Sequence, residues 1–161
     1  MMKVIIGISL FIFNVYAFAE GNEPNGFREL KWEDSINKYK DVMHLTSDDN
    51  KPSKFYTKEN DDMSYGSVKL KSIAYVFYKG KFSSVIFQTN KSASYSKQLL
   101  EMFKKTFGKP VYSNKYTKKF QWKGDSTNVS LKCYSTSHKC SVIFDSVAMS
   151  NLKKTDNTKN K

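Results

Sequence analysis

The chain of 161 residues carries 27 lysine or arginine residues against 15 aspartate or glutamate residues, which gives a formal net charge of +12. Its length suits one domain with a sizeable core, and 12 Phe, 10 Tyr and 2 Trp predict that this core is aromatic. Two histidines, two cysteines and seven scattered glycines provide neither a complete zinc ligand set nor a phosphate-binding glycine loop.

The first 19 residues predict a cleaved signal peptide. Lys3 precedes an apolar run over residues 4–13, and residues 17–19 (AFA) form the small-x-small pattern that signal peptidase accepts. The run is shorter than the ~20 residues that cross a bilayer, and Asn14 interrupts it, which argues against a membrane anchor. We therefore expect a mature chain that begins at Glu20, has no transmembrane span and is periplasmic or secreted, where thiols oxidise.

Composition divides the mature chain into three parts. Residues 20–26 (EGNEPNG) predict a flexible start, and residues 27–148 predict a single domain. Residues 149–161 are polar and basic and show no apolar periodicity, so we expect a disordered tail.

The first half of the domain predicts a short helix followed by two pairs of strands. Asp34 is placed as the helix N-cap, and Ile36, Tyr39 and Met43 share one helical face. Residues 54–70 predict a strand, a polar turn at residues 59–62 and a returning strand. Residues 72–89 predict a clearer hairpin whose turn lies at residues 79–81.

The second half predicts a stronger helix and three further strands. Within residues 92–110, Tyr95, Leu99, Phe103 and Phe107 recur every four residues, Gly108 takes the C-terminal position, and Pro110 prevents continuation. The strands are expected within residues 116–122, 128–134 and 140–146. Hairpin-length connections on both sides of this helix indicate an α+β fold, an antiparallel sheet of five to six strands with two helices packed on one face.

The two cysteines predict a disulfide. An antiparallel register that sets Cys133 opposite Cys140 also sets Leu131 opposite Val142, and it leaves residues 135–138 as a four-residue loop. Side chains of directly opposed residues are close enough for a disulfide. Two free buried thiols are the alternative, whereas a redox pair lacks the C-x-x-C spacing and zinc lacks a fourth ligand.

Five stretches of the chain resemble a family of small exported bacterial α+β proteins. They are GFRELKWEDSINKY (26–39), YTKENDDMSYG (56–66), IAYVFYKGKFSSV (73–85), MFKKTFGKP (102–110) and KFQWKGDSTNVSL (119–131). The resemblance covers residues 26–147 and implies export and an α+β fold, but no activity and no site residue. Glu33 stands where the family pattern has glycine, and the cysteine pair is not part of that pattern. At the level of fold alone, the chain is similar to periplasmic assembly modules of the outer-membrane lipoprotein type.

Charge is unevenly distributed along the mature chain. Residues 20–63 hold 7 basic and 11 acidic residues, whereas residues 64–161 hold 19 basic and 4 acidic residues. The densest basic clusters, with one interleaved aromatic residue, predict a surface for an anionic partner: Lys104, Lys105, Lys109, Lys115, Lys118, Lys119 and Trp122. Tyr112 and Tyr116 also interleave with these lysines and suit stacking on a ring. The alternatives are a helix dipole complemented by lysines, a strand kept soluble by them, and aromatic residues that belong to the core.

The sequence shows no catalytic signature. Neither His44 nor His138 lies near a nucleophile motif, and Asp61 and Asp62 fall in a polar turn that predicts solvated carboxylates. We therefore expect a non-enzymatic binding module without a cofactor or metal, whose partner is an acidic envelope component or an acidic protein. Export argues against nucleic acid as the physiological partner. The alternative function is a secreted inhibitor or effector that acts on another protein through a strand or loop.

Overall fold

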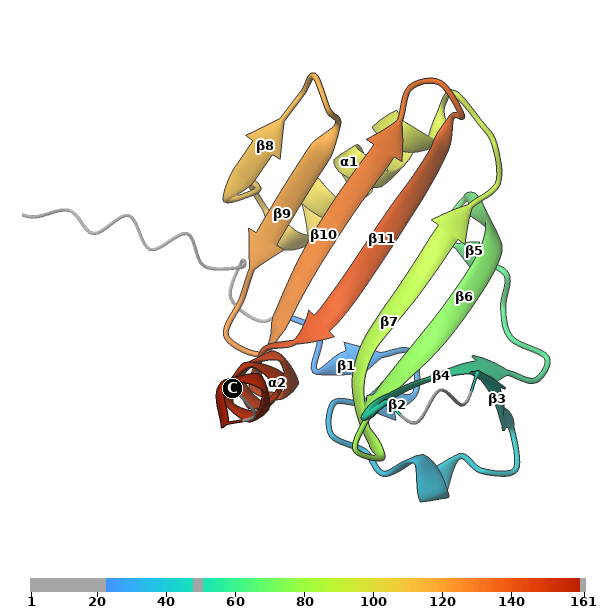
Figure 1. Cartoon of the computed structure of the whole chain (residues 1–161). Helices are drawn as coiled ribbons and strands as arrows, with labels where there is room; N and C mark the ends of the chain where they lie inside the picture. Colours follow the sequence, from blue (N-terminus) through green and yellow to red (C-terminus); the bar gives the residue numbers. More distant parts are fainter. Residues whose placement is uncertain (1–22, 48–50, 160–161) are drawn as a thin grey trace, which may run out of the picture.

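The computed structural model describes residues 23–47 and 51–159, and Figure 1 shows their arrangement. The strands and helices are β1 (Gly26–Phe27), β2 (Leu30–Lys31), a 3-10 helix (Ile36–Lys38), β3 (Met43–Ser47), β4 (Ser53–Lys58), β5 (Ser64–Tyr65), β6 (Val68–Tyr78), β7 (Lys81–Thr89), α1 (Tyr95–Phe107), β8 (Tyr112–Asn114), β9 (Lys119–Lys123), β10 (Thr127–Tyr134), β11 (Lys139–Ser146) and α2 (Val147–Lys159). The predicted signal peptide, residues 20–22 and residues 160–161 lie outside the described residues.

Nine strands of the described chain form one antiparallel sheet, which confirms the predicted α+β class but exceeds the predicted five to six strands. The sheet order is β3-β4-β6-β7-β11-β10-β9-β8, and β5 pairs with the start of β6. Strands β3, β4, β6 and β7 form a first meander, and strands β8 to β11 form a second. Pairing of β11 with β7 joins the two. The chain leaves β7, passes through α1 and enters the far edge at β8, so α1 lies behind the second meander (Figure 1).

One face of the sheet, the core face, carries the aromatic core. The antiparallel register aligns a row of five buried residues across five strands: Tyr75, Val85, Phe144, Val129 and Trp122. A second buried row runs beside it: Ile73, Phe87, Val142, Leu131 and Phe120. Because side chains alternate along a strand, the residues between these rows point to the opposite face.

Helix α1 covers the core face of the second meander. The predicted spacing is confirmed, because Leu99, Phe103 and Phe107 are all buried. The ring of Phe103 packs edge-on against Trp122, with 5.5 Å between ring centroids. Gly108 ends the helix with a φ of 76°, a left-handed value that glycine adopts without the strain of a Cβ atom.

The N-terminal segment Glu23–Asp34, which we call the strap, covers the core face of the first meander. Its side chains Phe27, Leu30 and Trp32 are buried. The indole N–H of Trp32 donates to the Thr127 hydroxyl over 2.7 Å, and the Glu23 carboxylate accepts the Thr127 amide over 2.7 Å. The flexible start predicted up to residue 26 is therefore a fixed part of the core cover from Glu23 onward.

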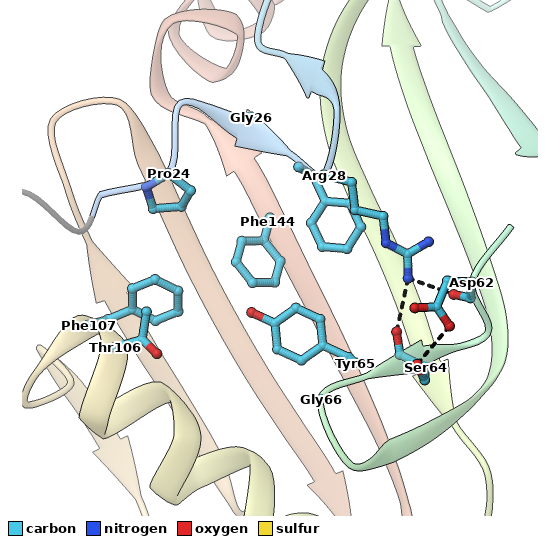
Figure 2. A pocket seen from close by; sticks show the side chains of 11 residues that line it. Pro24, Gly26, Arg28, Asp62, Ser64, Tyr65, Gly66, Thr106, Phe107 and Phe144 are labelled. Atoms are coloured by element: carbon cyan, nitrogen blue, oxygen red, sulfur yellow. Dashed lines mark hydrogen bonds between the residues drawn. The ribbon is translucent and has the colours of Figure 1, made fainter.

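Arg28 fastens the strap to the turn that carries β5. Its guanidinium pairs with the Asp61 carboxylate and donates to the carbonyls of Asp62 (2.6 Å) and Ser64 (3.0 Å), and Figure 2 draws both of these carbonyl bonds. The Tyr75 hydroxyl donates to the same Asp61 carboxylate over 3.0 Å. The prediction that Asp61 is solvated is wrong, because these partners hold its side chain in a site where it is 5% exposed.

Helix α2 replaces the disordered tail that the sequence predicted from residue 149. It packs on the face opposite α1, because its contacts go to Tyr78, which follows the core residue Phe77 on β6. Asp156 accepts the Tyr78 hydroxyl over 2.7 Å, Lys153 donates to the Ser83 hydroxyl over 3.1 Å, and Met149 is buried. These tertiary contacts hold a helix that lacks an apolar stripe. Of the two helices predicted on one face, only α1 forms as an α-helix, and the second helix of the structure, α2, packs on the other face.

The first predicted helix is wrong beyond a single 3-10 turn, Ile36–Lys38. The Ile36 amide donates to the Gly80 carbonyl over 2.9 Å, and the Phe82 amide donates to the Asp34 carbonyl over 2.8 Å. Backbone groups that a helix needs are therefore used for pairing with the β6–β7 hairpin. Asp34 is not the N-cap either: Ser35 takes that position, and the Asp34 carboxylate pairs with Lys38 and accepts the Tyr39 hydroxyl.

Short edge strands account for the remaining differences. β3, β5 and β8 have five, two and three residues, and the expected strand at residues 116–122 begins at Lys119 as β9. The predicted turn between β6 and β7 is confirmed: Lys79 and Gly80 have φ values of 50° and 78°. Two positive φ values match the type I′ turn that suits the twist of a hairpin.

Candidate binding surface

The second meander, β8–β11, has one face that no described element covers. We call it the open face, and it lies opposite α1. Alternation along β9 defines it: Phe120 and Trp122 are buried under the helix, whereas Lys119 and Lys123 are exposed on the other side. The register then assigns to it Tyr112, Asn114, Lys119, Gln121, Lys123, Asn128, Ser130, Lys132, Tyr134, Lys139, Ser141, Ile143 and Asp145.

Two lysines stand directly opposite each other on this surface. Lys119 of β9 is the register partner of Lys132 of β10, and both side chains are exposed. Directly opposed residues have Cβ atoms about 5 Å apart, and like charges in this position destabilise a sheet. Neither lysine, nor Lys123 or Lys139, forms an ion pair within the described part of the chain. The open face thus keeps uncompensated positive charge at a cost in stability.

Two tyrosines accompany these lysines. The Lys119 ammonium lies 5.8 Å from the Tyr112 ring centroid, and the Lys132 ammonium lies 4.8 Å from the Tyr134 ring centroid. The two rings are 43% and 45% exposed, so they remain available to a ligand. A ring beside an ammonium group can pack against a flat ligand group while the charge meets an anion.

The open face is also hollowed at two places. A depression of about 340 Å³ is lined by Gln88, Tyr134 and Lys139 among others, at the start of β11. A smaller one of about 190 Å³ is lined by Gln121, Lys123 and Asp145 among others, toward the other end of the strands. Charge, rings and surface relief therefore coincide on one side of the sheet.

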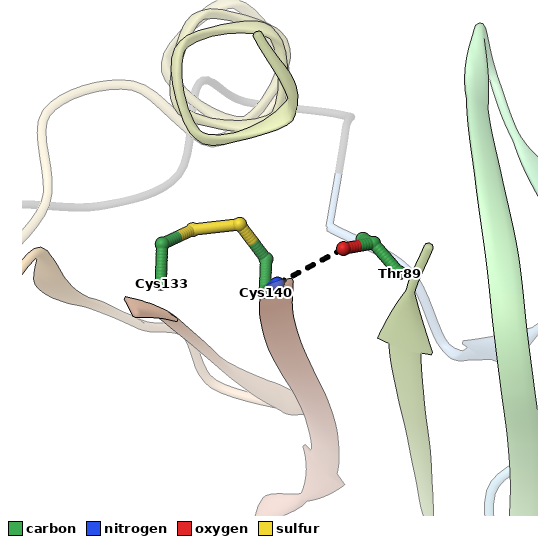
Figure 3. The surroundings of a disulfide bond; sticks show 3 residues. All are labelled: Thr89, Cys133 and Cys140. Atoms are coloured by element: carbon green, nitrogen blue, oxygen red, sulfur yellow. Dashed lines mark hydrogen bonds between the residues drawn. A yellow bond between two sulfur atoms is a disulfide. The ribbon is translucent and has the colours of Figure 1, made fainter. Parts of the chain in front are cut away.

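The disulfide lies beside the larger depression. Cys133 and Cys140 are bonded as predicted, and their register, with Leu131 opposite Val142, is also as predicted. The Cys140 amide donates to the Thr89 hydroxyl over 2.9 Å, which ties β11 to the end of β7 (Figure 3). This pairing fixes the hairpin that carries Lys132, Tyr134 and Lys139 at the edge of the depression.

The structure divides the predicted anionic-partner residues among different surfaces. Lys119 lies on the open face, and Lys115 and Lys118 flank the β8–β9 turn beside it, where Tyr116 is 85% exposed. Lys104, Lys105 and Lys109 belong to α1 and the segment after it, on the other side of the sheet.

Trp122 is not part of any exposed surface. Its side chain is 2% exposed, and its indole N–H donates to the Gly108 carbonyl over 2.9 Å. The prediction was wrong because strand alternation puts Trp122 on the core face, the side that α1 covers.

Sequence reasoning missed Lys123, Lys132, Tyr134 and Lys139 as members of the surface. The signal was present in the predicted hairpin: if Cys133 points inward, then Lys132 and Tyr134 point outward. Neighbours in sequence do not define a sheet surface, because such a surface collects residues from neighbouring strands.

No metal centre emerges among the described residues. No group of three or more His, Cys, Asp or Glu side chains within residues 23–47 and 51–159 is placed to hold a metal ion. His44 is exposed, 3.8 Å from the Glu59 carboxylate, and Asp61 is occupied by Arg28 and Tyr75. Over the same residues, no helix has the length and apolar character needed to span a membrane.

Comparison of the chain with protein-family models, with curated proteins and with solved structures finds no match. The resemblance to small exported bacterial proteins therefore stays a prediction, and the open face is interpreted from its own chemistry.

Proposed function

We propose that the protein is a non-enzymatic binding module whose open face holds an acidic polymer of the cell envelope or of the extracellular space. The observation that carries the proposal is the directly opposed pair Lys119 and Lys132, which has no acidic partner within the described residues. A bound anion would relieve the repulsion that the free protein tolerates.

The two exposed tyrosines favour a polymer with rings, an acidic polysaccharide, over an acidic protein. Tyr112 and Tyr134 each lie beside a lysine, so a sugar ring and its acidic group can be met by neighbouring side chains. The strands of the open face run side by side and form a broad surface, which suits an extended chain better than a small ion.

Salt-dependent binding tests the proposal, with dextran sulfate as the probe and isothermal titration calorimetry on the mature chain. Linear polyanions release counterions when lysines bind, so log K falls with log salt concentration by about 0.7 to 0.9 for each contact. The triple variant Lys119→Gln, Lys123→Gln, Lys132→Gln is expected to reduce that slope by about 2 to 3.

A matched triple on the other side of the molecule is the control. Lys104→Gln, Lys105→Gln, Lys109→Gln removes the same total charge from α1 and its end, and it is expected to leave the slope nearly unchanged. Equal losses in the two triples would show that net charge, not the open face, drives binding. The double variant Tyr112→Ser, Tyr134→Ser should weaken the binding of dextran sulfate more than the binding of poly-L-glutamate, which has no rings.

The inhibitor or effector function predicted as the alternative gives a different result. Binding of a protein through a packed strand or loop would persist at high salt, since apolar contacts are not screened. Tight binding of dextran sulfate that vanishes at about 0.5 M salt argues for the open face, and salt-resistant capture of a protein target argues against it.

A further inference from the structure

A pocket of about 360 Å³ opens on the core face, away from the open face. It lies where the strap, the β5 turn and the end of α1 fail to meet, so it is a gap in the cover of the core (Figure 2). Its lining comprises Pro24, Gly26, Phe27, Arg28, Asp62, Ser64, Tyr65, Gly66, Thr106, Phe107 and Phe144.

The walls of the pocket are aromatic and mutually supported. The Phe27 ring lies 5.4 Å from Phe144 between centroids, and Tyr65 lies 6.0 Å from Phe144 and 5.8 Å from Phe103. Rings packed at these distances hold each other in place. The pocket is therefore formed before a ligand arrives, as small-molecule sites commonly are.

The Tyr65 hydroxyl is one of the few polar groups of this mainly apolar lining, together with the Thr106 hydroxyl. The Tyr65 hydroxyl is directed into the pocket, toward the side where Thr106 and Phe107 lie (Figure 2). It makes no hydrogen bond to any described residue and stays accessible from the pocket, whereas Tyr75 and Tyr78 both bond carboxylates. Burial raises the pKa of Tyr65 to about 12, so the hydroxyl keeps its proton and can donate it to a ligand at neutral pH.

Arg28 borders the pocket but is already occupied. Both terminal nitrogens of its guanidinium already have partners that fasten the strap: one pairs with the Asp61 carboxylate, and the other donates to the carbonyls of Asp62 and Ser64. The adjacent Asp62 adds negative charge, and its hydrogen bond from Ser64 lowers the pKa of its carboxyl. A ligand carboxylate would find no free cation here and would be repelled.

We propose that this pocket binds a small, uncharged, mainly apolar molecule with one hydrogen-bond acceptor, which accepts the Tyr65 hydroxyl. The volume suits a ligand of one or two rings, since a cavity of about 150 Å³ already accommodates benzene. The apolar rings provide the burial, and the hydrogen bond from Tyr65 fixes the orientation. This site is separate from the open face and does not depend on the function proposed for it.

Three probes of similar size test the proposal by ¹H–¹⁵N NMR titration of the mature chain: 2-acetylnaphthalene, naphthalene and 2-naphthoate. We expect 2-acetylnaphthalene to bind most tightly, naphthalene less tightly because it has no acceptor, and 2-naphthoate most weakly because it is charged. Shift changes should centre on residues 64–66, 106 and 107. Absence of binding up to the solubility of the neutral probes would overturn the proposal.

Two variants separate the hydrogen bond from the space. Tyr65→Phe keeps the ring, and we expect it to lower the affinity for 2-acetylnaphthalene about fivefold and to leave the affinity for naphthalene unchanged. The control Tyr112→Phe should change neither affinity. Thr106→Phe fills the pocket from the side of α1 and should lower the affinity for both neutral probes at least tenfold. Unchanged affinity of 2-acetylnaphthalene in Tyr65→Phe, or in a folded Thr106→Phe protein, would overturn the assignment. Far-UV circular dichroism verifies the fold of each variant.

Discussion

Lys132 is the residue at which the conflict between stability and function should be most visible. Its side chain faces Lys119 across the β9–β10 pair without an acidic partner among the described residues. We expect Lys132→Thr to raise the free energy of unfolding by about 0.5 kcal/mol, because it removes a like-charge pair and adds a good strand former. The same change should lower the affinity of the protein for dextran sulfate.

Urea unfolding at two salt concentrations measures this effect. The gain should shrink at about 0.5 M salt, where the repulsion in the original protein is screened. Lys139→Thr is the matched control, because Lys139 is paired with Tyr134 and not with a second lysine. A gain of equal size in both variants would mean that strand propensity, not charge repulsion, is the cause.

Glu33 occupies a backbone position that suits glycine. Its φ is 67°, in the left-handed region, while its amide donates to the Phe82 carbonyl over 2.9 Å. The left-handed conformation costs a residue with a Cβ atom about 1 to 2 kcal/mol. Glycine avoids this cost, but its greater freedom in the unfolded chain cancels part of the gain in stability. We expect Glu33→Gly to raise the free energy of unfolding by about 0.5 to 1 kcal/mol.

Glu33→Ala distinguishes conformation from charge in the same urea experiment. It removes the carboxylate but keeps the Cβ atom, so it should leave the free energy of unfolding almost unchanged. Stabilisation by both changes would assign the effect to charge. The family pattern that the sequence resembles has glycine here, and a φ of 67° is a value that glycine adopts without strain.

At the scale of elements, local signals predicted what local structure decides. Helix α1 was predicted because its apolar spacing and its terminal Gly108 act within a few residues of each other. The β10–β11 hairpin was predicted with its register because alternation and the cysteine pair agree. The strap and α2 were missed because partners far away in sequence hold them: Thr127 holds Trp32, and Tyr78 holds Asp156.

Docking of α2 should depend on pH. Hydrogen bonds from Lys79 (2.6 Å) and Tyr78 (2.7 Å) hold the pKa of Asp156 below its ordinary value of 3.8. A carboxyl whose pKa is lowered on docking stabilises the docked state above that ordinary value, and the contribution disappears as pH falls toward the docked pKa. We therefore expect the amides of residues 147–159 to lose protection from hydrogen exchange below about pH 4.

Native-state hydrogen exchange by NMR, corrected for intrinsic rates, measures this loss. Asp156→Asn should lower the protection of α2 at pH 6 and abolish its further fall below pH 4. The amides of α1 provide the internal control, because that helix is fixed by buried aromatic residues and not by a carboxylate. Parallel loss in both helices would indicate global unfolding and would contradict local undocking.

At the scale of the whole molecule, three ion pairs lie near the strap and the first meander. Arg28 pairs with Asp61, Lys38 with Asp34, and Lys58 with Glu29. The sheet order places β3 and β4 at one edge and β8 and β9 at the other, where the open-face lysines lie. The charge imbalance visible in the sequence thus becomes a polarity along the sheet, which would orient the protein on an anionic surface.

The candidate surface was predictable in kind but not in membership. Net charge along the chain indicated that the second half is basic, and Lys119 was identified. The prediction that Lys104 and Trp122 share a surface with Lys119 is wrong, because the face that each residue occupies depends on which side of the sheet α1 covers. Sequence neighbours on a helix and a strand end up on opposite faces once the helix packs.

The strap should make the two meanders unfold together, since it contacts both. Arg28 fastens it to the β5 turn beside the first meander, and Trp32 bonds Thr127 at the start of β10 in the second. We expect Arg28→Met to lower the free energy of unfolding by about 2 to 3 kcal/mol, because Asp61 would remain buried without its cation. The loss should appear in both halves of the molecule.

The two tryptophans report on the two halves separately. Trp32 lies in the strap and Trp122 lies under α1, so Trp122→Phe and Trp32→Phe proteins each leave one fluorescent probe. Arg28→Met should lower the free energy of unfolding in urea by the same amount whichever probe is followed. The control Lys31→Met, on the exposed side of the strap, should change the free energy of unfolding reported by either probe by no more than about 0.5 kcal/mol. A shift confined to the Trp32 probe would show that the strap detaches by itself, and would mean that α1 and β8–β11 form a core that is stable without it.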